Sequence, residues 1–193
     1  MNAKRIQLPL DDQAISDLRA GDRVLLAGTV YTARDAAHKR MVEGLAKDVP
    51  PPFELKGATV YYCGPSPAPR GKPIGSAGPT TSSRMDCYVE ALVAQGVKAF
   101  IGKGARSPDV ARVLQEAKAI YFAAVGGLGA LLSLTIRGAE VVAYPDLGPE
   151  AVYRLDVEDF PAVVAIDIYG GDAYREAVSH YRAFVPGKSQ GSA

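Results

Sequence analysis

Four residues of this sequence could together bind a small anion: Arg34, Thr80, Arg84 and Lys103. An arginine guanidinium presents a planar pair of N–H donors that matches a carboxylate, and a lysine ammonium adds a compact point charge. A threonine hydroxyl beside such cations can donate or accept a hydrogen bond. Together these residues could form a cationic pocket that holds a small carboxylic acid.

The segment around Thr80 carries several of these features together. Residues 64–79 are rich in glycine and proline, and a loop of this length inside a compact domain is usually functional or disordered. Hydroxyl residues follow from Thr80 to Ser83, and Arg84 stands in the expected first turn of a helix. Hydroxyls and free backbone N–H groups at a helix start favour an anion. The alternative is that the hydroxyls only cap the helix while Arg84 points into water.

Lys103, Arg34 and His38 are weaker candidates when each is read alone. Lys103 lies between two glycines at a predicted strand end, where it could lean into a shared pocket, but surface lysines are common. Arg34 and His38 are four residues apart and so share one face of a predicted helix. His38 could exchange protons near neutral pH. It could equally be a surface histidine bonded to Asp35.

The elements that would position these residues alternate between strand and helix from residue 57 onward. Such alternation implies right-handed βαβ crossovers and a parallel sheet, with ligands beyond the carboxyl ends of its strands. Strands are predicted at residues 4–8, 23–31, 58–63, 97–101, 119–125, 140–144, 152–157 and 162–168. Helices are predicted at residues 11–18, 34–47, 84–95, 127–137 and 172–184, with one more opened by Ser107 and Pro108.

The expected fold is α/β, with a mainly parallel central sheet and a second, smaller sheet for the first and last strands. We expect one domain over residues 1–185 and a disordered tail at 186–193. Gly28 indicates a bulge or turn, and Glu158 with Asp159 indicates a turn between two strands. The glycines at 126, 127 and 129 lack the spacing of a dinucleotide-binding motif and are interpreted as tight helix–sheet packing.

The composition argues against several classes of protein. With 22 basic and 21 acidic residues, the chain gives no support to nucleic acid or membrane as its main partner. No apolar run reaches the roughly 18 residues that span a bilayer. The first ten residues contain no secretory signal pattern, so we expect a cytoplasmic protein. Cys63 and Cys87 are expected to be free thiols, and two cysteines cannot by themselves hold an iron–sulfur cluster.

Read together, five segments resemble the β subunit of two-subunit class I fumarases and L-tartrate dehydratases. That subunit corresponds to the C-terminal domain of the single-chain enzymes. The segments occur in family order over about residues 5 to 175, and those at 33–40 and 78–86 are the most specific. They are ARDAAHKR (33–40), YYCGP (61–65), GPTTSSRMD (78–86), IGKG (101–104) and LDVEDFPAVVAID (155–167).

This resemblance implies a swivelling β/β/α domain of three layers that packs against an α subunit. The α subunit of such enzymes carries a [4Fe-4S] cluster on three cysteines, so no cofactor or metal ligand is expected in this chain. By this resemblance, Arg34, Thr80, Arg84 and Lys103 match positions that contact the dicarboxylate. A threonine at the position of Thr80 is proposed as the base in such enzymes, so Thr80 and Lys103 are the catalytic candidates. His38 lies in a matched segment without a firm role.

The activity that the resemblance implies is the reversible hydration of fumarate to L-malate, a reaction of the tricarboxylic acid cycle. The expected assembly is an α2β2 heterotetramer, or a β dimer when the chain is isolated. Two alternatives stay open. One is an L-tartrate dehydratase β subunit, and the other is a non-catalytic domain that binds dicarboxylates and gains no activity from an α subunit.

Overall fold

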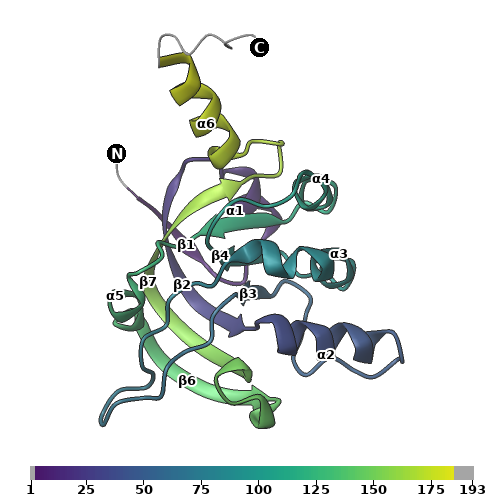
Figure 1. Cartoon of the computed structure of the whole chain (residues 1–193), viewed down its shortest axis with the longest axis vertical. Helices are drawn as coiled ribbons and strands as arrows, with labels where there is room; N and C mark the ends of the chain where they lie inside the picture. Colours follow the sequence, from purple (N-terminus) through teal and green to yellow (C-terminus); the bar gives the residue numbers. More distant parts are fainter. Residues whose placement is uncertain (1–2, 185–193) are drawn as a thin grey trace, which may run out of the picture.

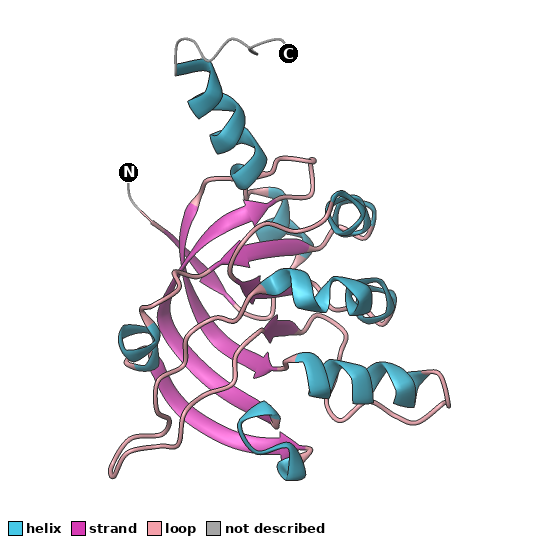
Figure 2. Ribbon diagram, in the orientation of Figure 1, coloured by secondary structure: helices cyan, strands magenta, loops and turns pink. Residues whose placement is uncertain are grey.

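A computed structural model describes residues 3–184 (Figures 1 and 2). The strands are β1 Lys4–Gln7, β2 Arg23–Thr32, β3 Thr59–Tyr61, β4 Ala99–Gly102, β5 Ile120–Ala123, β6 Ile136–Ala143 and β7 Val152–Ile166. The helices are α1 Asp12–Ser16, α2 Asp35–Leu45, α3 Asp86–Ala94, α4 Pro108–Glu116, α5 Gly129–Ser133 and α6 Ala173–Phe184, with 3₁₀ helices at Ser82–Met85 and Pro145–Glu150. The predicted tail at 186–193 lies outside the described residues.

All seven described strands belong to one hydrogen-bonded sheet in the order β1-β2-β3-β4-β5-β7-β6. Strands β1 to β5 pair in parallel, whereas β7 runs antiparallel to β2, β5 and β6. Because β7 pairs with both β2 and β5, the pairings close a ring through β2, β3, β4, β5 and β7. The mixed α/β class is confirmed. The sheet is partly antiparallel, and the first and last strands join it rather than forming a separate one; the three-layer swivelling arrangement stays a prediction.

The long strand β7 corrects the prediction of two strands at 152–157 and 162–168. The backbone runs through Glu158 and Asp159 without a turn, because β7 pairs with the same strand, β2, on both sides of them. Their side chains pair with Arg137 and Arg5 on other segments. Asp159 has φ 54°, and the register against β2 shifts between Leu26 and Gly28. The two strands therefore form a β-bulge at this point, as Gly28 indicated. A Cβ atom at Gly28 would lie 2.6 Å from the carbonyl oxygen of Leu8, so only glycine fits.

The inner parallel strands β3, β4 and β5 are buried on both faces, which explains their nearly continuous apolar sequence. Along β3 and β4, successive side chains alternate between two hydrophobic clusters. Tyr61 and Ile101 join the cluster shared with β2 and β7, while Val60 and Phe100 join the cluster beneath the helices. Figure 1 shows α2, α3 and α4 side by side on one side of the strands, and α5 on the other. Packing against both faces of the sheet therefore holds the strand ends in place.

Helix α5 is much shorter than the helix predicted at residues 127–137. It ends at Ser133, and β6 begins at Ile136, whose partner in the sheet is Val157. Strand pairing therefore takes over residues that also fit a helical pattern. No helix within residues 3–184 has the length and hydrophobicity needed to cross a membrane.

Candidate functional site

The parallel strands β2, β3 and β4 end at one edge of the sheet, and the residues that follow bring the candidates there. Arg34 comes two residues after β2. The N–H of Thr80 donates to the carbonyl of Tyr62, directly after β3, at 2.7 Å. Lys103 follows β4, and its N–H donates to the carbonyl of Thr80 at 3.3 Å, while the N–H of Ser82 donates back to the Lys103 carbonyl at 3.0 Å. The backbones of Thr80 and Lys103 are therefore locked side by side. We call Arg34, Thr80, Arg84 and Lys103 the candidate site.

This close approach depends on a glycine at the end of β4. A Cβ atom at Gly102 would overlap the hydroxyl of Ser82 and lie 2.8 Å from a ring carbon of Tyr62. The side chain of Lys103 runs along Gly126, where a Cβ would lie 3.1 Å from its Cδ atom. Small residues thus give the 80–82 segment and the lysine room to lie against the sheet edge.

Arg84 and Arg34 meet through a shared acid at the start of α2. Arg84 binds Asp35 with two contacts, Nε to Oδ1 at 2.9 Å and an Nη2–Oδ2 ion pair at 2.8 Å. Arg34 lies 4.0 Å from the same carboxylate and 3.3 Å from Glu150. The four candidates therefore lie on neighbouring segments, and the structure brings them to one edge.

The capping interpretation of residues 80–83 does not fit their contacts. Arg84 lies in the 3₁₀ helix Ser82–Met85 rather than in an α-helical turn, and Thr81 at its N-cap makes no side-chain cap hydrogen bond. The Ser82 hydroxyl lies 2.8 Å from the hydroxyl of Tyr121 instead. Among residues 3–184, neither the Thr80 hydroxyl nor the Lys103 ammonium has a side-chain partner. Both groups are free to meet a ligand.

His38 is not a surface residue, so that interpretation is wrong. Its side chain is buried, and its Nδ1 donates to the carbonyl of Arg34 at 2.9 Å rather than to Asp35. The ring lies against Tyr62 and Tyr88. Burial, together with the nearby charge of Arg106, lowers the pKa of His38 to about 4. The imidazole is therefore neutral at neutral pH.

Arg106 belongs to this region although nothing in its sequence setting singled it out. Its side chain is fully buried and donates to Asp86 and to the hydroxyl of Tyr62. A buried arginine with two protein acceptors is uncommon, because desolvation of the charge must be offset by such contacts. The only sequence signal was its position in the loop after β4, three residues beyond Lys103.

The two cysteines are both free, as predicted. Cys63 is buried, and burial raises its thiol pKa to about 12, while Cys87 is exposed. Within the part of the chain that the structure describes, no group of three or more His, Cys, Asp or Glu side chains could hold a metal ion. These residues do not fit an iron–sulfur cluster, which needs three or four thiolates.

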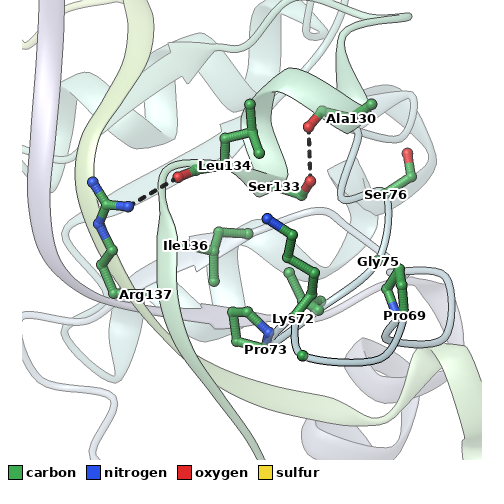
Figure 3. A pocket seen from close by; sticks show the side chains of 12 residues that line it. Pro69, Lys72, Pro73, Gly75, Ser76, Ala130, Ser133, Leu134, Ile136 and Arg137 are labelled. Atoms are coloured by element: carbon green, nitrogen blue, oxygen red, sulfur yellow. Dashed lines mark hydrogen bonds between the residues drawn. The ribbon is translucent and has the colours of Figure 1, made fainter.

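A cavity of about 620 Å³ lies outside the candidate site (Figure 3). It is lined by the 69–76 part of the long loop, by α5 and by the start of β6. Figure 3 shows Lys72 and Arg137 at this cavity, with Arg137 donating to the carbonyl of Leu134 at 3.3 Å. None of the four candidates lines it, so this cavity and the candidate site are different features.

A family model described as "Fumarase C-terminus" matches residues 1–177. The chain belongs to this family. It is 36% identical over 178 residues to "Fumarate hydratase 2" of Leishmania major, covering 90% of this chain and 31% of that protein. It is 37% identical over 167 residues to "Fumarate hydratase class I, anaerobic" of Escherichia coli K12, covering 86% and 30%. The chain thus spans about a third of the length of these fumarate hydratases.

A third relative has nearly the length of this chain. The chain is 36% identical over 173 residues to "Putative L(+)-tartrate dehydratase subunit beta" of Methanocaldococcus jannaschii, covering 86% of this chain and 89% of that one. The family therefore includes both C-terminal parts of longer fumarate hydratases and a chain named as a separate subunit. This agrees with the resemblance drawn from the sequence.

Proposed function

We propose that this chain is the β subunit of a hydro-lyase that interconverts fumarate and L-malate. In this proposal it supplies the cationic, dicarboxylate-binding half of an active site that an α subunit completes. The observation that carries the proposal is the backbone contact between Thr80 and Lys103 at the ends of β3 and β4. Arg34 follows the neighbouring strand β2, and Arg84 is joined to Arg34 through Asp35. The cationic groups suit the two carboxylates of a small diacid.

Hydration of a double bond beside a carboxylate requires groups that hold both carboxylates and move a proton at the neighbouring carbon. Arg34 and Arg84 would hold the diacid through their guanidinium groups. Lys103, whose ammonium has no ion-pair partner within residues 3–184, would stabilise the negative charge that develops on the carboxylate. Thr80 would exchange the proton at carbon. Because a threonine hydroxyl is a weak base, it must be deprotonated or relay the proton through a neighbour such as Lys103.

The [4Fe-4S] cluster of the proposed enzyme belongs to the α subunit. The surroundings of the two cysteines support this division. The Cys63 thiol is buried and has a raised pKa, and the Cys87 thiol lies exposed on α3. When bound, such a cluster supplies a Lewis acid for the substrate hydroxyl. The remaining functions, which are gripping the diacid and moving its proton, are assigned to this chain.

The face beside Lys103 is assigned to the α subunit. Large apolar side chains are exposed along one short segment there: Val125 (58%), Leu128 (40%), Leu131 (59%) and Leu134 (56%). The segment adjoins the candidate site, because Gly126 contacts the Lys103 side chain and Gly129 packs on Gly78. A partner that completes the site from outside would cover this face. The α2β2 assembly and the cytoplasmic location remain predictions.

L-tartrate is the second candidate substrate, favoured by the near-full-length match to the tartrate dehydratase subunit. L-tartrate and L-malate are both hydroxy diacids, and the same cations could hold either one. Only the groups that contact the extra hydroxyl would differ.

Reconstitution tests the proposal. The chain is co-expressed with an α subunit that contains three spaced cysteines, the complex is purified without oxygen, and turnover of fumarate and L-tartrate is measured. Turnover of fumarate supports the proposal, and turnover of L-tartrate alone supports the second candidate. If the isolated chain binds dicarboxylates but the complex turns over neither diacid, both enzyme functions are contradicted and a non-catalytic binding domain is favoured.

A further inference from the structure

Arg106 lies beneath the candidate site and connects three of its supporting segments. Its Nε donates to Asp86 Oδ1 at 2.7 Å, and its Nη1 donates to the Tyr62 hydroxyl at 3.2 Å. The other oxygen of Asp86 accepts from the N–H of Ser107 at 3.0 Å. The start of α3, the end of β3 and the loop after β4 are thereby tied to one guanidinium.

The same guanidinium also lies over two aromatic rings. Its central carbon is 5.2 Å from the ring centre of Tyr62 and 5.1 Å from that of Tyr121. Cation–π contacts are stronger in a desolvated setting such as this one than at an exposed surface. Arg106 therefore fixes the Tyr62 and Tyr121 rings as well as the hydrogen bonds around them.

Both tyrosines lead directly to the candidate site. The carbonyl of Tyr62 accepts from the N–H of Thr80 at 2.7 Å. The hydroxyl of Tyr121 donates to the carbonyl of Gly104 at 2.8 Å and lies 2.8 Å from the Ser82 hydroxyl. Gly104 adjoins Lys103, and Ser82 is hydrogen-bonded to the Lys103 carbonyl. Both tyrosines that contact Arg106 are therefore hydrogen-bonded to the segments that contain Thr80 and Lys103.

We propose that Arg106 is a positioning residue of the candidate site, which holds the backbones of Thr80 and Lys103 in register through Tyr62, Tyr121 and Asp86. This inference rests on the proposed function where it concerns turnover. Arg106 itself is fully buried and does not reach a ligand. Misplacement of reacting groups by about 1 Å can lower a rate about 100-fold, so a support of this kind acts on turnover more than on binding.

The test compares Arg106→Lys with Arg112→Met. The lysine keeps the positive charge but cannot donate to Asp86 and Tyr62 at the same time through separate guanidinium nitrogens. Arg112 is the control, because it is an exposed residue of α4 that pairs with Glu116. The first readout is amide hydrogen exchange of the isolated chain, under conditions in which both variants are folded. For Arg106→Lys we expect exchange at least about tenfold faster at Thr80, Ser82 and Lys103, with no change at β7 amides. Arg112→Met should match the wild type.

The second readout is kinetic and uses the reconstituted complex. We expect Arg106→Lys to lower kcat about 30-fold or more while KM changes less than about threefold, because Arg34 and Arg84 do not contact Arg106. Uniformly faster exchange across the sheet, or kcat and KM within twofold of the wild type, would overturn the positioning role. Absence of turnover in the wild-type complex would contradict the proposed function instead, and the exchange pattern would then decide the role of Arg106 by itself.

Discussion

The parallel and antiparallel parts of the sheet use their charged residues differently. At the ends of β2, β3 and β4, segments far apart in the sequence converge, and they bring Arg34, Thr80 and Lys103 to one edge of the sheet. On β6 and β7 the charged side chains pair with neighbours across or along the strands, as in Arg137 with Glu158 and Arg154 with Asp156. A parallel sheet collects side chains at one edge, whereas an antiparallel pair lets charges neutralise each other locally. Charge marks a candidate site only where the topology brings it together with others.

The largest effect is expected for Thr80→Ala in the reconstituted complex. Loss of the group that moves the proton should lower kcat by about 10² to 10⁴, while KM changes little because the cations remain. Steady-state kinetics with fumarate measure both constants. Thr29→Ala is the control, since Thr29 lies on β2 and its hydroxyl contacts Asp156, away from the candidate site. Equal turnover by Thr80→Ala and the wild type would exclude the proton-transfer role.

The comparison between the two parts of the sheet is sharpest for Lys103→Met and Arg154→Met. Removal of the Lys103 ammonium should lower kcat/KM by about 10² to 10³, because a developing negative charge loses its donor. Removal of the Arg154 guanidinium on β7 should leave kcat/KM within about twofold of the wild type. Similar losses in both variants would show that general positive charge, and not the strand-end position, attracts the diacid.

The stability of the chain should depend on pH through His38, which lies under the parallel edge beside Tyr62, Tyr88, Arg106 and Asp35. The folded state holds the pKa of His38 at about 4, below its ordinary value of 6.5, so below pH 6.5 the unfolded chain binds a proton that the folded chain does not. The free energy of unfolding should therefore fall as the pH falls from 6.5 to about 4, by about 3 kcal/mol.

Urea unfolding over this pH range measures the effect, with His38→Gln as the variant. Glutamine keeps an N–H donor for the Arg34 carbonyl but does not titrate. The variant should lose the part of the pH dependence that His38 contributes. The same slope in the variant and the wild type would show that other groups cause it.

Two glycine substitutions compare the rigidity of the two parts. Gly102→Ala should lower the free energy of unfolding by about 1 to 3 kcal/mol, because its Cβ would meet Ser82 and Tyr62, which are both buried. Gly138→Ala on β6 should change it by less than about 0.5 kcal/mol, because its Cβ would meet only the terminal oxygen of Asp156, whose side chain is half-exposed and can turn away. Equal losses at both positions would contradict this difference in rigidity.

The smallest effect concerns the face assigned to the α subunit. Leu131→Asp should weaken binding of the α subunit at least about tenfold, because a charge would replace an apolar contact. Val178→Asp is the matched control, since Val178 is also half-exposed but lies on α6, which projects from the body in Figure 1. Titration with labelled α subunit measures both affinities. A larger loss of affinity for Val178→Asp than for Leu131→Asp would show that the α subunit binds at α6 instead.

Much of the parallel part could be predicted from the sequence, because its signals are local. Apolar runs and the N-cap at Ser107 each act within a few residues, and the N-cap is confirmed. The bulge that Gly28 indicated is also confirmed, although it lies where β2 pairs with antiparallel β7. The antiparallel part depends on long-range pairing. Glu158 and Asp159 resembled a turn because the β2 residues that pair with β7 on both sides of them lie elsewhere in the sequence.

Some residues of the candidate site could likewise be predicted from the sequence, and others could not. Arg34, Thr80, Arg84 and Lys103 could be named because they lie in specific segments, and their common edge follows from parallel topology. Their functional roles remain predictions. The burial of His38 and the contacts of Arg106 could not be predicted, because each depends on aromatic rings supplied by β3, α3 or β5.

The acids beside the two arginines have a consequence for ligand exchange. Asp35 and Glu150 already occupy guanidinium donors that an incoming carboxylate would use. Binding of a diacid in the proposed reaction is therefore a replacement of one carboxylate by another, and little net electrostatic free energy is gained. The same two acids can pair with the arginines again as the product leaves. The chain thus carries its own competitors for the substrate, which favour moderate affinity and rapid release.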